Sequence, residues 1–171
     1  RDEMVSHVYD ITYGSVKGGT DTLVVIDDSI VRGTTLQKSI LSILDRLNPK
    51  KIIIVSSAPQ IRFPDCYGID MSRMYDFIAF RSLVGLLKDR NLSDKLDEVY
   101  QKCKEDDLKP AAEVKNHVKD LYALFTPEEI SEKISEIVRP NHIFADVKVI
   151  YQTIEDLHLA CPKNLGDWYF T

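Results

Sequence analysis

One segment, residues 22–35, constrains the fold of this chain more than any other. It begins with consecutive apolar residues at 23–26, mostly β-branched, which predict a strand buried on both faces. Two acids, Asp27 and Asp28, follow directly, and a helical apolar pattern then predicts a helix over about 34–47. The order strand, acids, loop and helix is typical of an open parallel α/β sheet, in which ligands bind beyond the carboxyl ends of the strands.

The loop between the acids and the predicted helix has the composition of a phosphate-binding segment. Gly33 allows the backbone to bend closely around an anion, and the hydroxyls of Ser29, Thr34 and Thr35 can donate to its oxygens. A helix N-terminus adds unpaired N–H groups and the positive end of a dipole. The two carboxylates suit sugar hydroxyls, a divalent cation, or both. A ligand with a phosphate at one end and a vicinal diol near a metal at the other is a phosphorylated ribose.

The run Asp-Asp-Ser-Ile-Val-Arg-Gly-Thr-Thr at 27–35 resembles the motif with which type I phosphoribosyltransferases bind phosphoribosyl pyrophosphate (PRPP). In this form it is similar to the amidophosphoribosyltransferase family in particular. Two later blocks, at 57–64 and 67–71, also resemble that family. The resemblance is close over about residues 20–82 and weaker beyond. For the acidic pair alone, an ordinary strand-end turn would be the favoured interpretation.

The resemblance implies a partial type I phosphoribosyltransferase fold: an open, mainly parallel sheet with flanking helices, followed by a mainly helical carboxyl-terminal region. It implies that the acidic pair binds the ribose hydroxyls of PRPP and helps to hold Mg²⁺, and that the loop binds the 5′-phosphate. No side chain is assigned as a catalytic acid or base, because ammonia is already a nucleophile. The predicted PRPP-binding residues are Asp27, Asp28, Ser29, Ile30, Val31, Arg32, Gly33, Thr34 and Thr35, and the predicted metal ligands are Asp27 and Asp28.

The activity implied by the resemblance is the first committed step of de novo purine synthesis. PRPP, glutamine and water give phosphoribosylamine, glutamate and pyrophosphate, and purine nucleotides act as feedback inhibitors. The family's glutaminase domain would lie upstream of Arg1 in the same polypeptide, so we expect this chain alone to lack glutamine-dependent activity. Two alternatives stay open: a type I phosphoribosyltransferase acting on a nucleobase, and a non-catalytic module that senses PRPP.

Composition restricts the partners and the compartment. Lys and Arg number 22 against 27 Asp and Glu, so the formal charge of −5 argues against nucleic acid as a partner. No apolar run is long enough for a membrane span, and residues 1–20 lack the apolar core of a signal peptide. The few, widely spaced cysteines, at 66, 103 and 161, favour a reducing cytoplasm. An iron–sulfur cluster is not expected, because no Cys-x-x-Cys pair occurs and four thiolates are usual.

The rest of the chain is expected to divide near residue 90. We predict a carboxyl-terminal half of a phosphoribosyltransferase domain over 1–90 and a mainly helical extension over 91–171. A short sheet with exposed strand edges favours a homo-oligomer. Within the block that follows the second predicted strand, Arg62, Tyr67 and Asp70 either line the ligand site or hold a folded loop together. The residue types alone do not separate these two interpretations.

Further elements are predicted from local patterns. A short helix is expected over 1–14 and a second strand over 51–55, parallel to the first. The sequence Thr-Pro-Glu-Glu at 126–129 is a capping signature that predicts a helix start. A third strand is expected over 147–151, and a last helix begins near residue 153.

Overall fold

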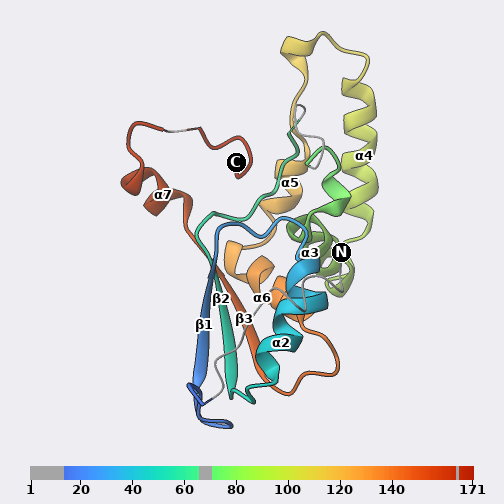
Figure 1. Ribbon diagram of the computed structural model, residues 1–171. Coiled ribbons are helices and arrows are strands. Elements are labelled where there is room, and N and C mark those ends of the chain that lie inside the picture. The colour runs from blue at the N-terminus through green and yellow to red at the C-terminus, as the bar shows by residue number, and fades with distance from the viewer. Residues whose placement is uncertain (1–13, 66–70, 165) are drawn as a thin grey trace.

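A parallel sheet in the order β1-β2-β3 forms the centre of the computed structural model, which describes residues 14–65, 71–164 and 166–171 (Figure 1). The α/β class with an open parallel sheet is thereby confirmed. The predicted helix over 1–14 falls almost entirely outside the described residues. The carboxyl ends of the strands meet at one edge of the sheet, where Asp27, Ser56 and Tyr151 lie side by side. The strands are β1 (Thr22–Asp27), β2 (Lys51–Ser56) and β3 (Asp146–Tyr151).

Helical segments connect the strands, and a single helical run links β1 to β2. That run begins with a π-helical turn and continues as an α-helix, close to the predicted range 34–47. A much longer connection of several helices separates β2 from β3, and one helix follows β3. The segments are η1 (Leu36–Ile40), α2 (Leu41–Asp45), η2 (Met74–Asp76), α3 (Ile78–Asp89), α4 (Asp94–Asp106), η3 (Ala111–Glu113), α5 (Val118–Tyr122), α6 (Pro127–Val138) and α7 (Ile154–Ala160).

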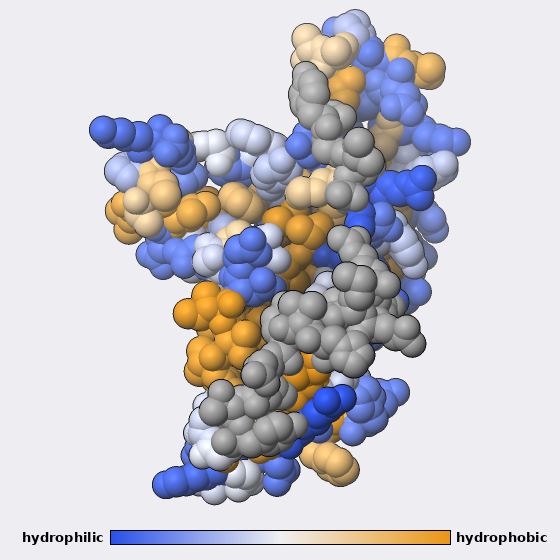
Figure 2. Space-filling model, viewed as in Figure 1, coloured by the Kyte–Doolittle hydropathy of each residue, from blue (hydrophilic) through white to orange (hydrophobic). Residues whose placement is uncertain are grey.

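Some of the described helices, α3 and α6 among them, cover one face of the sheet. Ile52, Ile54 and Val149 point to that face and are at most 1% exposed, in one cluster with side chains of α3 and α6. Successive strand residues point to opposite faces, so the alternate side chains Val24 and Ile26 lie on the other face and are 60% and 76% exposed. The prediction that residues 23–26 are buried on both faces is therefore wrong. Figure 2 shows apolar side chains gathered on the surface over the strands.

Helix α6 is fixed at its start and against β3. Its predicted capping box is confirmed: the Thr126 hydroxyl accepts from the Glu129 N–H, and the Glu129 carboxylate accepts from the Thr126 N–H. The buried Ser135 hydroxyl donates to the Ser131 carbonyl and accepts from the Val149 N–H of β3 at 2.8 Å. Because β3 belongs to the sheet, both the sheet and the core contain residues from before and after residue 90. The predicted domain boundary near residue 90 stays a prediction.

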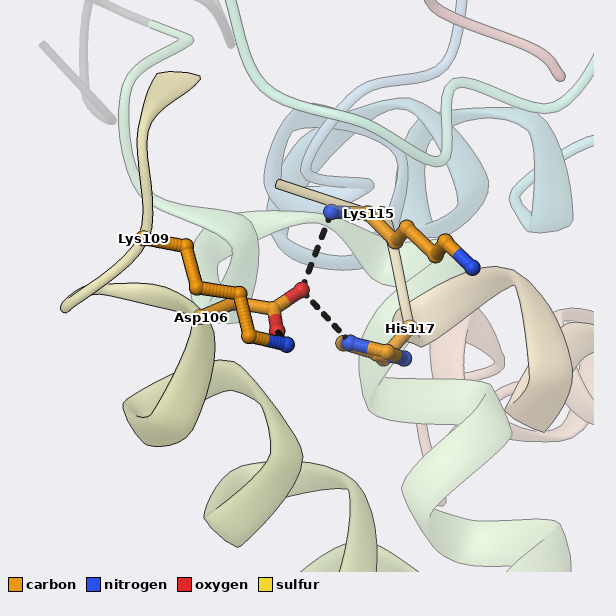
Figure 3. A network of polar contacts seen from close by, with 4 residues as sticks. All are labelled: Asp106, Lys109, Lys115 and His117. Atoms are coloured by element: carbon orange, nitrogen blue, oxygen red, sulfur yellow. Dashed lines mark hydrogen bonds and ion pairs between the residues drawn. The ribbon is translucent and has the colours of Figure 1, made fainter. Parts of the chain in front are cut away.

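A cluster of polar side chains lies between the end of α4 and the start of α5 (Figure 3). The Asp106 carboxylate, 3% exposed, accepts from Lys109 Nζ at 2.6 Å and from His117 Nε2 at 2.8 Å. It also accepts from the Lys115 N–H at 3.0 Å. These donors, Lys109 first, hold the pKa of Asp106 far below its ordinary value. A single carboxylate thus joins the end of α4 to the segment that leads into α5.

Candidate functional site

The acidic pair ends β1 and is held by local hydrogen bonds. The Asp28 N–H donates to Asp27 Oδ1 at 3.0 Å, and the Ser29 N–H donates to Asp28 Oδ1 at 2.7 Å. Ser57, after β2, donates from its N–H to the Asp27 carbonyl at 2.9 Å, and its hydroxyl lies 3.2 Å from the carbonyls of both acids. The backbone under the two carboxylates is therefore fixed by the neighbouring strand.

The two carboxylates have different surroundings. Asp28 is exposed, whereas Asp27 is half-buried on the helix-covered side of the sheet. Burial raises the pKa of Asp27; the Asp28 N–H opposes this effect and the Asp28 charge reinforces it. Across the sheet edge, burial and the Asp27 charge raise the pKa of Tyr151, whose buried hydroxyl has no hydrogen-bond partner among the described residues. The site thus contains a partly desolvated acid beside a neutral phenol.

Gly33 allows the loop after the acidic pair to lie close to two helices. It has a φ of +69°, and a Cβ at this position would lie 3.0 Å from Val138 Cγ1 and 3.4 Å from Ile78 Cγ1. Any other residue would meet both a left-handed backbone and a close contact. Ile30 belongs to the core at 3% exposure, so only its backbone is available to a ligand.

The first turn of the helical run that follows the loop faces solvent. Thr34 and Thr35 are exposed, and the Gln37 N–H donates to the Gly33 carbonyl at 3.0 Å. The preceding amides at 34–36 have no carbonyl four residues earlier within the helix, as at every helix start. With the positive end of the helix dipole, this turn suits an anion such as a phosphate.

Helix α3 holds the other side of the loop. The Ile78 N–H donates to the Val31 carbonyl at 2.8 Å, and Arg81 Nη2 donates to the Arg32 carbonyl at 2.7 Å. The Arg32 side chain lies 3.9 Å from the Asp76 carboxylate. Arg81 was not predicted from the sequence; its signal is a cationic residue within the largely apolar first turns of α3.

The acidic pair has the donor chemistry for a hard divalent cation. No group of three or more His, Cys, Asp or Glu side chains suited to a metal occurs in the ranges that the structure describes. Mg²⁺ takes oxygen ligands and commonly binds to one or two carboxylates together with substrate phosphates. Asp27 and Asp28 therefore fit Mg²⁺ as partial ligands, with the remaining ligands supplied by a bound substrate and water.

The other residues singled out by sequence lie elsewhere. The Arg62 guanidinium donates to Gln60 Oε1, at 2.8 Å from Nη2, and stacks over the Tyr122 ring at 5.0 Å from its centroid. These contacts favour the packing interpretation of Arg62. Cys103 is half-buried and Cys161 exposed, both as free thiols. Tyr67, Asp70 and Cys66 lie outside the described residues.

Comparison with known proteins supports the resemblance seen in the sequence. The chain is 38% identical over 86 residues to the amidophosphoribosyltransferase of Escherichia coli, covering 45% of this chain and 17% of that protein. It is 31% identical over 93 residues to the amidophosphoribosyltransferase of Saccharomyces cerevisiae, covering 50% of this chain and 18% of that protein. A third relative, from Staphylococcus aureus, is 34% identical over 74 residues, covering 43% of this chain and 15% of that protein.

These similarities are partial. The matched region spans less than a fifth of the length of each of these curated relatives. No protein-family model matches the chain. Among the described residues, no helix has the length and apolarity that crossing a membrane requires.

Proposed function

We propose that this chain is the PRPP-binding part of an amidophosphoribosyltransferase, a pentosyltransferase of purine synthesis. The observation that carries the proposal is the arrangement at the carboxyl edge of the sheet. There, an acidic pair, a loop packed through Gly33 and an exposed helix start follow one another within nine residues, 27–35. The similarity to proteins named amidophosphoribosyltransferase favours this enzyme over a nucleobase phosphoribosyltransferase and over a PRPP-sensing module.

Each part of the site has a role in this proposal. The carboxylates of Asp27 and Asp28 accept hydrogen bonds from the ribose diol, and their negative charge stabilises the positive charge that develops at the anomeric carbon. The amides of the loop and the hydroxyls of Thr34 and Thr35 hold the 5′-phosphate. Mg²⁺, when bound, would neutralise charge on the departing pyrophosphate. Fixing the sugar at both ends leaves the anomeric carbon in a defined position for attack by ammonia.

Several broader parts of the proposal rest on the family resemblance of the sequence rather than on this site. They comprise a glutaminase domain in the same polypeptide, inhibition by purine nucleotides, a homo-oligomeric state and a cytoplasmic location. The exposed edge strand β1 is consistent with the oligomer.

Calorimetric titration with PRPP and Mg²⁺ tests the proposal. We expect binding to the wild-type chain and an affinity at least about tenfold lower in the Asp27→Asn and Asp28→Asn variants, because each loses a charged hydrogen-bond acceptor. Asp21→Asn is the matched control: Asp21 lies just before β1, at the end of the strand away from the site, where it accepts from the Lys17 N–H at 2.9 Å. Wild-type affinity in both site variants, or equal loss in the control, would show that the acidic pair does not hold PRPP.

A further inference from the structure

Two successive carbonyls of the phosphate-binding loop are tied to one helix. The Val31 carbonyl accepts from the backbone of α3 at Ile78, and the Arg32 carbonyl accepts from the Arg81 side chain one turn further along. The first contact comes from the main chain, so any residue at position 78 except proline supplies it. The second exists only because residue 81 is a long side chain with a donor at its tip.

These contacts determine the direction of two amides in the loop. In a planar trans peptide the carbonyl of one residue and the N–H of the next point in opposite directions. With the Val31 and Arg32 carbonyls directed at α3, the N–H groups of Arg32 and Gly33 point away from that helix. They therefore point toward the side of the loop opposite α3. Two adjacent N–H groups with a common direction form a concave site suited to an anion.

Arg81 is committed to this contact by its surroundings. It is only half-exposed, and its Nε is buried without a hydrogen-bond partner among the described residues. A buried donor left unpaired is costly and calls for an explanation. The bond from Nη2 to the Arg32 carbonyl offsets part of that cost and keeps the guanidinium beside the loop.

We propose that Arg81 is a positioning residue for phosphate binding. It fixes the Arg32 carbonyl so that the amides of Arg32 and Gly33 face the 5′-phosphate of the substrate. Arg81 itself does not touch the ligand. This inference rests on the proposed function, since it assigns Arg81 to the same phosphate site.

The test compares Arg81→Met, Arg81→Lys and the control Lys88→Met in the full 171-residue chain. Arg81→Met removes both the donor and the charge, whereas Arg81→Lys keeps the charge and a donor. Lys88→Met removes an equal charge from an exposed position near the other end of α3. Binding of ribose 5-phosphate is measured by calorimetry. Backbone amide spectra of each unliganded variant report the loop conformation, and thermal melting reports folding.

We expect Arg81→Met to weaken ribose 5-phosphate binding by about tenfold or more, because the loop loses a charge-assisted hydrogen bond that orients it. Arg81→Lys should recover part of that loss, and Lys88→Met should bind as the wild type does. The amide signals of residues 31–35 should shift in Arg81→Met while the melting temperature changes little. A purely structural role would instead lower the melting temperature and spread the shifts through the core.

The outcomes separate this inference from the proposed function. If the wild-type chain binds ribose 5-phosphate and Arg81→Met binds it equally well, the positioning role is wrong and the proposed function stands. If Lys88→Met loses as much affinity as Arg81→Met, the effect is general charge attraction and the positioning role is again wrong. If the wild-type chain binds neither PRPP nor ribose 5-phosphate, the proposed function fails, and the role of Arg81 fails with it.

Discussion

Gly33 shows how a single residue links the loop to the core. Its backbone lies in the left-handed region at a φ of +69°, and its missing side chain leaves room for Val138 and Ile78. Gly19 has a nearly identical φ of +70°, but among the described residues no atom beyond its chain neighbours lies within 4 Å of a Cβ at this position. A side chain at Gly19 would therefore meet only backbone strain, whereas a side chain at Gly33 would meet both backbone strain and a steric clash.

We predict that Gly33→Ala is clearly more destabilising than Gly19→Ala. The left-handed backbone costs about 1–2 kcal/mol in either variant. The contact with α3 and α6 adds about 1 kcal/mol or more at Gly33 alone. Denaturant unfolding of both variants measures the difference. Equal losses of stability in the two variants would contradict the prediction, since the loop would then move away from the helices at no cost. PRPP titration of Gly33→Ala would show whether the phosphate site tolerates that movement.

The role of Arg81 could not be predicted from the sequence, for a physical reason. The segment 27–35 contains its own local signals: acids after an apolar run, a glycine, and hydroxyls before a helix. Arg81 lies 49 positions from its partner Arg32, and only the packing of α3 beside the loop brings them together. Local patterns predict the residues that face a ligand, whereas the residues that orient the loop from behind depend on tertiary structure.

Among the elements, the strands were located to within one residue, but their burial was only partly predicted. Four apolar residues in a row are compatible with burial on both faces or with one covered and one open face, and periodicity does not separate the two. In β1 the open-face residues are Val24 and Ile26, whereas Val25 packs against the core cluster. The burial of a strand depends on which helices return to the sheet, and that information lies far along the chain.

The Asp106 carboxylate joins the end of α4 to the segment before α5, which leads to a pH prediction. The folded state depresses the pKa of Asp106, so its stabilising contribution is fully present above the ordinary Asp value, about 4, and is lost as pH falls through the folded value. We expect the melting temperature of the wild-type chain to fall more steeply below about pH 4 than that of Asp106→Asn.

The matched control for that prediction is Asp107→Asn, the exposed neighbour of Asp106. Near neutral pH, Asp106→Asn should melt several degrees below Asp107→Asn, because Lys109 and His117 lose a charged acceptor (Figure 3). Melting curves recorded by circular dichroism between pH 7 and about pH 3 test both statements. Parallel pH profiles for the wild type and Asp106→Asn would show that the carboxylate does not control the acid response.

At the scale of the whole molecule, the sheet and the core contain residues from both of the regions, 1–90 and 91–171, into which the sequence pattern divides the chain. Composition changes near residue 90, yet Val149 of β3 and Ile134 of α6 lie in the same buried cluster as Ile54 of β2. Parallel strands have no short connecting turn that marks their pairing, and β2 and β3 are separated by most of the helices. The order of the strands in such a sheet therefore cannot be predicted from local sequence patterns, even where each strand is correctly located.

The uncovered sheet face gives the last prediction. Val24 and Ile26 of β1 and the half-buried Ile53 and Val55 of β2 form an apolar surface beside a strand edge that no other described strand covers (Figure 2). Exposed edges and large apolar patches promote association between copies of a chain. We therefore expect the wild-type chain to self-associate in sedimentation velocity experiments, with the β1 edge and this face buried between copies.

The double variant Val24→Thr with Ile26→Thr should shift the chain toward monomer. Its free energy of unfolding should change by less than about 0.5 kcal/mol per site, because both side chains are exposed and Thr suits a strand. Val25→Thr, on the covered face of the same strand, is the control: it should cost about 1–3 kcal/mol and leave the association unchanged, since its hydroxyl enters the core. A wild-type chain that sediments as a single monomer would contradict the prediction, because the apolar face and the β1 edge would then remain in water without driving association.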